Sequence, residues 1–410
     1  MRLRQPRRRL TLARRSWSAA GVGALRLSAR RAHLDADNPL RALTEVIGRV
    51  PGGINLGQGV CELPPPVALR RGVADALADG EPQTYTPYAG IPELRAAIAA
   101  KLREWNGVDV PDDGVIVTTG SSSAFFAAGL ALFEPGDEVV LFEPFYSYHR
   151  SQLRLLGAVP VAVPLAPPDF ALDVDALARA LGPRTRAVVV NTPANPTGQV
   201  FTRAELEAVA ALLAPTDVAV VTDEVYEHLC YDGRRHVSPA AVPALRERTI
   251  AIGSFSKTFS ITGWRIGWCA ASPPTLEAIG RVFDQMAVCA PRPLQRGVLR
   301  ALRELPAEYY AGLRADYARR RDVFCAALAT AGFRFRPPEG AYYVLADYRD
   351  VLGDVDPTAA AMRLIERARV NAVPGDLFHA CGDGVRTLRF HFAVPDPVLD
   401  EVCARLARLG

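Results

Sequence analysis

The chain has 410 residues, of which 49% are hydrophobic and 22% are charged, a composition typical of a globular protein with a sizeable core. Single hydrophobic cores stop growing at roughly 250–300 residues, so this length predicts two domains. The formal net charge is +4, but residues 1–34 hold ten Arg and no acid. Residues 35–410 therefore carry −6, which gives no reason to expect nucleic-acid binding.

The basic segment 1–34 is predicted to be a disordered tail, with an Arg-rich mitochondrial transit peptide as the alternative, although Ser is sparse. The sequence holds no run of 18 apolar residues, so no membrane span is predicted. The seven cysteines form no C-x-x-C pair and the six histidines lack metal-ligand spacing, which favours a reducing compartment and no metal site. We therefore expect a cytoplasmic protein, or a mitochondrial one if the tail is a transit peptide.

From residue 91 onward, short apolar runs alternate with helical patterns. The predicted strands are 115–118, 139–142, 159–163, 187–191, 218–222, 249–253 and 266–270. The predicted helices between them are 92–105, 121–133, a segment that ends at 156, and 204–213. This alternation predicts an α/β fold with a mostly parallel central sheet and helices on both faces.

The C-terminal part of the chain shows a different pattern. A long helix over 307–331 leads into an apolar run at 340–345, and a helix over 357–368 precedes another run at 386–392. This pattern predicts a smaller α+β domain. We expect residues 61–295 to form the large domain, and residues 35–60 together with 296–410 to form the small one.

Polar residues follow four of the predicted strands, and sites in open α/β sheets form at the carboxyl ends of strands. Gly120 and Ser121 open a helix whose free N–H groups suit an anion, although Ser is also an ordinary N-cap. Asn191 and Asn195 lie in a rigid turn and can donate hydrogen bonds, although a plain loop is the alternative. Asp223 follows a buried strand, where an acid is costly unless it is paired.

Lys257 follows the fourth of these strands in a chain that almost lacks lysine. Among the 48 Lys and Arg residues only Lys101 and Lys257 are lysines, so a lysine that remains is a candidate for amine chemistry, which Arg cannot perform. Lys101 lies in a helical pattern and is interpreted as a solvated surface charge. Lys257 lies in a Ser- and Gly-rich stretch near Arg265, a residue type that suits phosphate. Together, the four strand ends predict a pocket for a phosphorylated, ring-bearing aldehyde.

Three motifs carry a resemblance to a known family: Asn195-Pro196-Thr197-Gly198, Asp223-Glu224-Val225-Tyr226, and Ser254-Phe255-Ser256-Lys257 followed by Gly263-Trp264-Arg265. In order and spacing they resemble the class I/II aminotransferase family, which has fold type I of the pyridoxal-phosphate (PLP) enzymes. The resemblance extends over about residues 40–408. It implies pyridoxal 5'-phosphate as the cofactor and the two-domain architecture of that fold type.

The resemblance also implies a role for each matching residue. Lys257 holds PLP as a Schiff base and then moves the proton from the substrate Cα. Asp223 pairs with the pyridine nitrogen, and Asn195 and Tyr226 hydrogen-bond the ring hydroxyl oxygen. Tyr146 stacks on the ring, with a plain core aromatic as the alternative. The groups expected to hold the phosphate are Ser254, Arg265 and the backbone of Ser121 and Ser122.

The substrate is expected to bind through Arg389, which grips the α-carboxylate, with Gly57 and Asn195 beside it. Tyr85 matches a tyrosine that reaches the phosphate of the neighbouring subunit. The resemblance therefore implies a homodimer with shared active sites, which acts on small amino and 2-oxo acids.

Within the family, the segments 54–59, 86–90 and 256–265 resemble the branch of kynurenine, glutamine and methionine aminotransferases. The sequence departs from that branch at the substrate entrance, where Cys61 is interpreted as a packed thiol. Glu62 is a solvated acid or a partner for a basic substrate group. The donor is expected to be methionine, glutamine or an aromatic amino acid. Four aromatics are possible pocket walls, each with a core role as the alternative: Tyr88, Phe145, Tyr342 and Tyr343.

These features predict transfer of an amino group from an L-amino acid to a 2-oxo acid in a ping-pong cycle. An alternative that keeps the same residues is β-elimination, cyclisation or oxidation of the amino acid from the same carbanion. A PLP-fold regulator that senses amino acids is a third hypothesis. The tail is too short for a winged-helix domain, however, and Lys257 and Asp223 are both intact.

Overall fold

The structure, a computed structural model, describes residues 28, 30, 39–80, 83–166 and 169–409. The prediction of a disordered basic tail over 1–34 therefore falls almost wholly outside the described residues. Within the described part of the chain, no helix combines the length and the apolar character that a membrane crossing requires.

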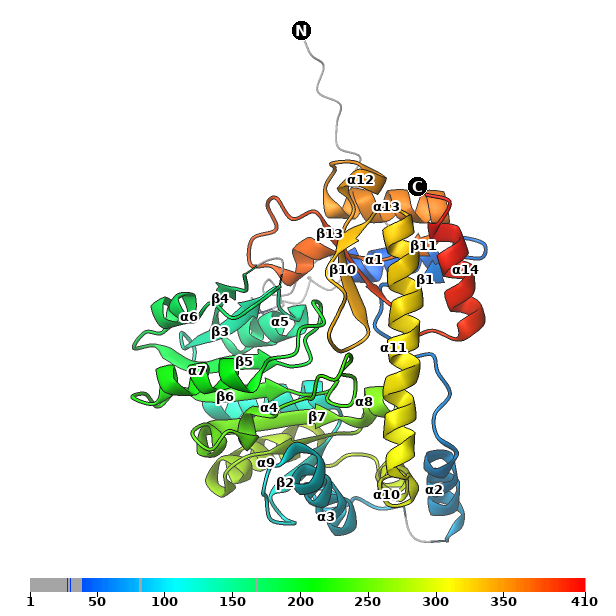
Figure 1. Ribbon diagram of the computed structural model, residues 1–410. Helices are drawn as coiled ribbons and strands as arrows, with labels where there is room; N and C mark the ends of the chain where they lie inside the picture. The colour runs from blue at the N-terminus through cyan, green and yellow to red at the C-terminus, as the bar shows by residue number, and fades with distance from the viewer. Residues whose placement is uncertain (1–27, 29, 31–38, 81–82, 167–168, 410) are drawn as a thin grey trace, which may run out of the picture.

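A seven-stranded sheet forms the centre of the larger part of the molecule (Figure 1). Its strand order is β2-β8-β7-β6-β5-β3-β4, and only β8 runs antiparallel to its neighbours. The strands are β2 (Val115–Thr118), β3 (Glu138–Glu143), β4 (Val159–Pro164), β5 (Thr185–Asn191), β6 (Ala219–Asp223), β7 (Thr249–Ser254) and β8 (Gly267–Ala270). The mostly parallel central sheet is therefore confirmed.

Helices cover both faces of this sheet because successive strand side chains point to opposite sides. On β3, Val139 and Leu141 pack with α4 (Ser121–Leu132), α5 (Ser147–Leu156) and α9 (Pro273–Ala287). The intervening Val140 and Phe142 pack with α6 (Val174–Ala180) and α7 (Arg203–Leu213). Near β2, the second face is completed by α2 (Val67–Ala78), α3 (Pro92–Lys101) and α10 (Arg292–Glu304).

The smaller part of the molecule is built on a four-stranded antiparallel sheet of order β12-β13-β10-β9. Its strands are β9 (Arg334–Phe335), β10 (Tyr343–Asp347), β12 (Val373–Pro374) and β13 (Thr387–His391), and the short strands β1 (Ile54–Asn55) and β11 (Val370–Asn371) pair beside it. Its helices are α1 (Pro39–Gly48), α12 (Arg349–Leu352), α13 (Pro357–Ala368) and α14 (Asp396–Leu406). This confirms the smaller α+β unit, while the boundaries at residues 60 and 295 stay a prediction.

The long helix α11 (Ala307–Thr330) runs from the small unit down the side of the large one (Figure 1). The carboxyl ends of the parallel strands face the small unit. In the strand register, Asn191 at the end of β5 lies opposite Asp223 at the end of β6, and Asp223 lies opposite Ile252 on β7. Side chains that follow these strands therefore meet at one edge, as expected of an open α/β sheet.

Candidate active site

A cleft of about 1830 Å³ opens where the carboxyl ends of the large sheet meet the small unit. Its wall contains residues from both parts of the molecule. Of the predicted site residues, ten line it: Ser121, Ser122, Tyr146, Asn195, Asp223, Tyr226, Ser254, Lys257, Arg265 and Arg389. The cleft also includes α1 residues of the small unit, of which Arg41 and Arg49 are cationic.

Asp223 lines the cleft, and one of its two carboxylate oxygens is held by a histidine. His149 Nε2, on α5, lies 3.0 Å from Asp223 Oδ2, and the imidazole is stacked on Phe125 with ring centroids 4.5 Å apart. Asp223 Oδ1 is buried and has no hydrogen-bond partner among the described residues. A buried, unpartnered carboxylate oxygen is costly in isolation, so it fits a cationic ligand group such as a pyridinium N–H.

Lys257 lies in the short helix α8 (Phe255–Thr258), directly after β7. Its Nζ donates to the Gly59 carbonyl at 3.0 Å and sits near the rings of Tyr226 and Tyr342, 5.9 and 5.4 Å from their centroids. Burial lowers the pKa of the Lys257 amine below its ordinary value. The neutral, nucleophilic amine is therefore accessible at lower pH than for a solvated lysine.

Arg389 lies on β13 and lines the cleft, and two hydrogen bonds hold its guanidinium in place. NH1 donates to Asn195 Oδ1 at 2.8 Å and NH2 to the Gly57 carbonyl at 2.6 Å. Nε is buried without a hydrogen-bond partner in the described structure. The guanidinium also lies over the rings of Tyr343 and Phe378, at 4.4 and 4.9 Å. A fixed guanidinium of this kind suits a carboxylate.

An anion cradle lies at the start of α4. Gly120 (φ +86°) precedes the helix, and Ser121 begins it. No side chain caps this end, so the first backbone N–H groups of the helix, beside the cleft, are available to an anion. A Cβ at Gly120 would lie 2.3 Å from an Arg265 guanidinium nitrogen, which shows how closely that side chain approaches the backbone here. Arg265 itself has a left-handed backbone (φ +58°), a conformation uncommon outside glycine. This combination fits a phosphate group.

Ser254 combines two functions in this structure. Its hydroxyl accepts from the Ser256 N–H and has two neighbours for its single proton, Ser256 Oγ at 2.7 Å and the Ile266 carbonyl at 3.1 Å, so it caps α8 and also lines the cleft. It therefore fixes the start of the turn that carries Lys257.

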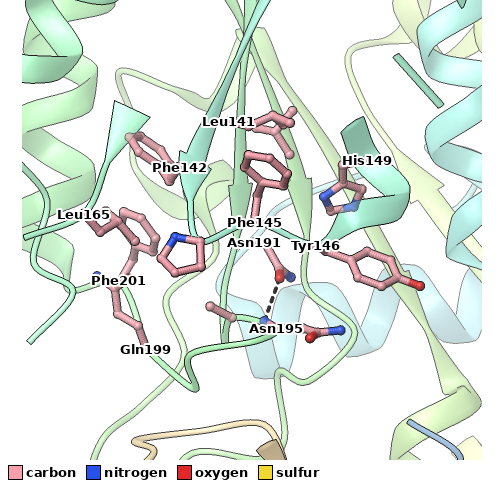
Figure 2. A pocket seen from close by; sticks show the side chains of 13 residues that line it. Leu141, Phe142, Phe145, Tyr146, His149, Leu165, Asn191, Asn195, Gln199 and Phe201 are labelled. Carbon is pink, nitrogen blue, oxygen red and sulfur yellow. Dashed lines mark hydrogen bonds between the residues drawn. The ribbon is translucent and has the colours of Figure 1, made fainter. Parts of the chain in front are cut away.

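Figure 2 shows side chains of the loops after β3 and β5, which line a small cavity. Asn191 Oδ1 accepts a hydrogen bond from the Asn195 backbone N–H at 2.8 Å, which fixes the turn that carries the Asn195 amide. Behind this turn lies a small cavity of about 20 Å³, enough for one water molecule, which buried Gln199 lines with an unpartnered Oε1. Tyr146 lies at its edge and points away from the apolar side chains of Phe142 and Phe201.

Other predicted residues lie outside this cleft. Tyr85 is 79% exposed and is not part of the cleft of its own chain. Of the four candidate aromatic walls, Tyr343 lines the cleft, whereas Tyr88, Phe145 and Tyr342 do not. Glu62 is exposed and also absent from its lining.

Cys61 is a packed thiol, as interpreted from the sequence. It is buried, and its Sγ lies 3.1 Å from Ser260 Oγ and 3.0 Å from Tyr317 OH. Cys61 therefore belongs to the packed interior and is not part of the cleft lining.

The prediction that Lys101 is a solvated surface charge is wrong. Its side chain is only 10% exposed and pairs with buried Glu227, and its ammonium lies 5.1 Å from the Trp268 ring centroid. The helical pattern correctly placed Lys101 in a helix, at the end of α3. The π-helical turn η2 (Leu102–Asn106) follows, and from it Asn106 Nδ2 donates to the Glu227 carboxylate at 2.8 Å. Although burial opposes it, Lys101 and nearby histidines lower the pKa of Glu227 to about 2.

A second carboxylate, Glu224, lies beside this pair, directly after Asp223. It accepts from Thr222 Oγ1 and Ser238 Oγ and pairs with His236 Nε2 at 2.6 Å. Candidate ligand atoms of Glu224, Glu227 and His236 lie within 4.8 Å of one another. Because both carboxylates already have cationic or hydroxyl partners, the network serves to fix the turn that carries Asp223 and Tyr226.

Comparison with known proteins agrees with this geometry. The family model "Aminotransferase class I and II" matches residues 51–406. The probable N-succinyldiaminopimelate aminotransferase of Mycobacterium tuberculosis is 40% identical over 88% of this chain and 93% of its own, and methionine aminotransferase of Escherichia coli is 34% identical over 87% and 92%. The solved structure of the former enzyme matches with a TM-score of 0.89 at 38% identity, over 94% of this chain and 100% of that one.

The chain therefore belongs to the class I and II aminotransferase family with the PLP fold type I. It is a PLP-dependent enzyme that transfers amino groups. When bound, PLP supplies an electron sink for the carbanion that remains after the substrate loses its Cα proton. The free oxygen of Asp223, the cradle at Ser121 and the buried Lys257 amine are the features of this chain that fit the cofactor.

Proposed function

We propose that this chain transfers the amino group of an apolar or aromatic L-amino acid to a 2-oxo acid, with Lys257 as the base that moves the substrate proton. The observation that carries the proposal is that one cleft contains both a buried Lys257 amine and an Asp223 oxygen, Oδ1, that has no hydrogen-bond partner in the described structure. Arg389 would hold the α-carboxylate, with Asn195 and Gly57 fixing its orientation. This arrangement would present the Cα–H to the amine.

The donor class is inferred from the wall beside Arg389. Tyr343 and Phe378 contact its guanidinium, and Val373 and Leu377 also line the cleft. An apolar wall at this point suits a donor such as methionine or an aromatic amino acid. The name of the Escherichia coli relative points the same way. Arg41 on α1 favours a second candidate, a donor with a distal acid group, whereas Arg49 pairs with Glu45 of the same helix at 3.8 Å. The name of the Mycobacterium tuberculosis relative agrees with that candidate.

The remaining predicted residues would bind the cofactor. Asp223 would pair with the pyridine nitrogen, Tyr226 and Asn195 with the ring oxygen, and Tyr146 with a ring face. The phosphate would be held by Ser121, Ser122, Ser254 and Arg265. The approach of Arg265 to Gly120 and the uncapped start of α4 support this assignment.

We further infer a homodimer in which Tyr85 enters the partner's site. Tyr85 is the most exposed of the large hydrophobic side chains in the described structure, at 79%, which fits a role outside its own subunit. Tyr88, three residues further on, differs from Tyr85 because its ring packs against Gly280 of α9 in the same chain.

A cytoplasmic location remains the preferred prediction. All seven cysteines are free, which fits a reducing compartment. The mitochondrial alternative depends on residues 1–34, almost all of which lie outside the described part of the chain.

The first test is the visible spectrum of the purified protein with PLP, recorded during addition of single amino acids without an oxo acid. Wild type should show a lysine-dependent band that methionine or an aromatic donor bleaches, and Lys257→Ala should not form that band. Bleaching only by donors with a distal acid would favour the second candidate. Release of ammonia while the band persists would instead support elimination or oxidation, and the absence of any lysine-dependent band in wild type would overturn the proposal.

A further inference from the structure

Tyr343, in the small sheet, contacts both Arg389, the proposed carboxylate-binding residue, and Tyr226, the proposed ring-binding residue. It begins β10, where it lies opposite His391 of β13, while Arg389 lies opposite Leu345. Tyr343 and Arg389 are therefore diagonal neighbours on the same face of the sheet. Tyr343 is 2% exposed, and its ring lies 4.4 Å below the Arg389 guanidinium.

The hydroxyl group of Tyr343 lies 3.0 Å from the hydroxyl of Tyr226. The chain makes room for it at Gly59, where a Cβ would lie 2.0 Å from the Tyr343 oxygen. Any other residue at position 59 would displace this hydroxyl. The pair of tyrosine hydroxyls is thus a defined feature of the site, and the cation–π contact with Arg389 fixes the ring that carries one of them.

We propose that Tyr343 is a positioning residue that strengthens the hydrogen bond donated by Tyr226 to the ring oxygen of PLP. The inference rests on the proposed function of Tyr226. A phenol has one proton, so Tyr226 can donate to the cofactor only if Tyr343 is the donor between the two hydroxyls. A hydroxyl that accepts one hydrogen bond also donates a stronger one, because such bonds polarise each other in a buried site.

The surroundings keep both phenols in this arrangement. Burial, followed by the proximity of Tyr343, raises the pKa of Tyr226 well above its ordinary value, so it remains a neutral donor. The titratable and charged groups that face the pair from the adjoining elements are Asp223, Tyr146, Lys257, Tyr342, Arg389 and His391. Burial lowers the pKa of His391 to about 3, so this imidazole stays neutral across the titration.

The direction of the effect follows from charge. A stronger hydrogen bond to the ring oxygen favours the form with more negative charge on that oxygen, which is the form whose Schiff-base nitrogen has lost its proton. Removal of the Tyr343 hydroxyl should therefore raise the pH midpoint of the visible band of the PLP-loaded enzyme. A cooperative gain of a tenth to a third of a charge-assisted hydrogen bond corresponds to a rise of about 0.1–0.7 pH units.

The test is a spectrophotometric pH titration of PLP-loaded wild type, Tyr343→Phe, Tyr226→Phe and the double variant. The midpoint should rise in Tyr343→Phe, and Tyr343→Phe should add nothing in the Tyr226→Phe background. The donor KM of Tyr343→Phe should stay near that of wild type, because phenylalanine keeps the ring beneath Arg389. Tyr348→Phe is the matched control, since its buried hydroxyl bonds the Val355 carbonyl away from the cleft.

An unchanged midpoint in Tyr343→Phe, or an equal rise in both backgrounds, would overturn the inference while leaving the proposed function standing. The absence of a lysine-dependent band in wild type would instead remove the proposed function itself. Thermal melting of all four proteins separates either result from a folding defect.

Discussion

At the scale of single residues, the site depends on groups that are left incomplete inside the protein. Asp223 has one oxygen paired with His149 and one without a partner, and Arg389 has a buried Nε without a partner in the described structure. Buried polar atoms are almost always hydrogen-bonded in folded proteins, so two incomplete groups in one cleft indicate two ligand contacts. The sequence predicted both residues through their motifs, but it gave no sign of His149.

Replacement of His149 by phenylalanine tests the support behind Asp223. The ring should keep its stack on Phe125 but lose the hydrogen bond to the carboxylate. A hydrogen bond to a charged group contributes about 1.5–3 kcal/mol, so kcat should fall roughly 10- to 100-fold with little change in donor KM. Steady-state kinetics at saturating PLP measure this, and a wild-type kcat in His149→Phe would show that Asp223 needs no partner.

At the scale of elements, adjacent strand ends place the motifs together. β5, β6 and β7 run parallel, so the segments that follow them meet at one edge. Short apolar runs predicted these strands within one or two residues, because both faces of the sheet are buried. The sequence analysis missed α9 and α10. Each has a proline in its first two positions, Pro273 and Pro293, which is a recognised signal of a helix start.

Packing between elements also predicts how stability depends on pH. His228 lies between Trp105 of η2 and Tyr310 of α11, and burial lowers its pKa to about 3. The unfolded chain binds a proton at this residue below about pH 6.5 while the folded chain does not, so folding free energy is lost as pH falls from 6.5 toward 3. The loss is about 1.4 kcal/mol per pH unit in that window.

His228→Phe keeps an aromatic ring between Trp105 and Tyr310 and removes the titration. The slope of unfolding free energy between pH 6.5 and 4.5 should decrease by about 1.4 kcal/mol per pH unit relative to wild type. Urea unfolding at several pH values measures the slope. Equal slopes in the two proteins would mean that His228 is protonated in the folded state.

At the scale of the whole molecule, the cleft exists because the small unit faces the strand ends of the large one. Asn195 and Arg389 are 194 residues apart in the chain, yet they form one hydrogen-bonded unit across the cleft. α11 links the two parts along one side (Figure 1). In the proposed homodimer, the exposed Tyr85 would extend the same principle to a second copy of the chain.

Subunit complementation tests the shared site. Lys257→Ala and Tyr85→Ala are each expected to be nearly inactive alone, but a mixed dimer contains one site with both residues intact. After subunit exchange, random mixing places half of the protein in such dimers, so about a quarter of wild-type activity should return. Activity that stays at the level of the separate variants, with exchange verified by mass, would place Tyr85 in its own subunit's site or outside any site.

The central sheet and the family could be predicted from the sequence alone, and candidate cofactor residues could be named, because these depend on local features: apolar runs, the ends of strands and short motifs. Only the tertiary structure decided that Lys101 pairs with Glu227, that His149 supports Asp223, and that Tyr343 meets Tyr226. These contacts join residues 126, 74 and 117 positions apart. No local pattern encodes such pairs, because burial and partner choice are set by how whole elements pack against each other.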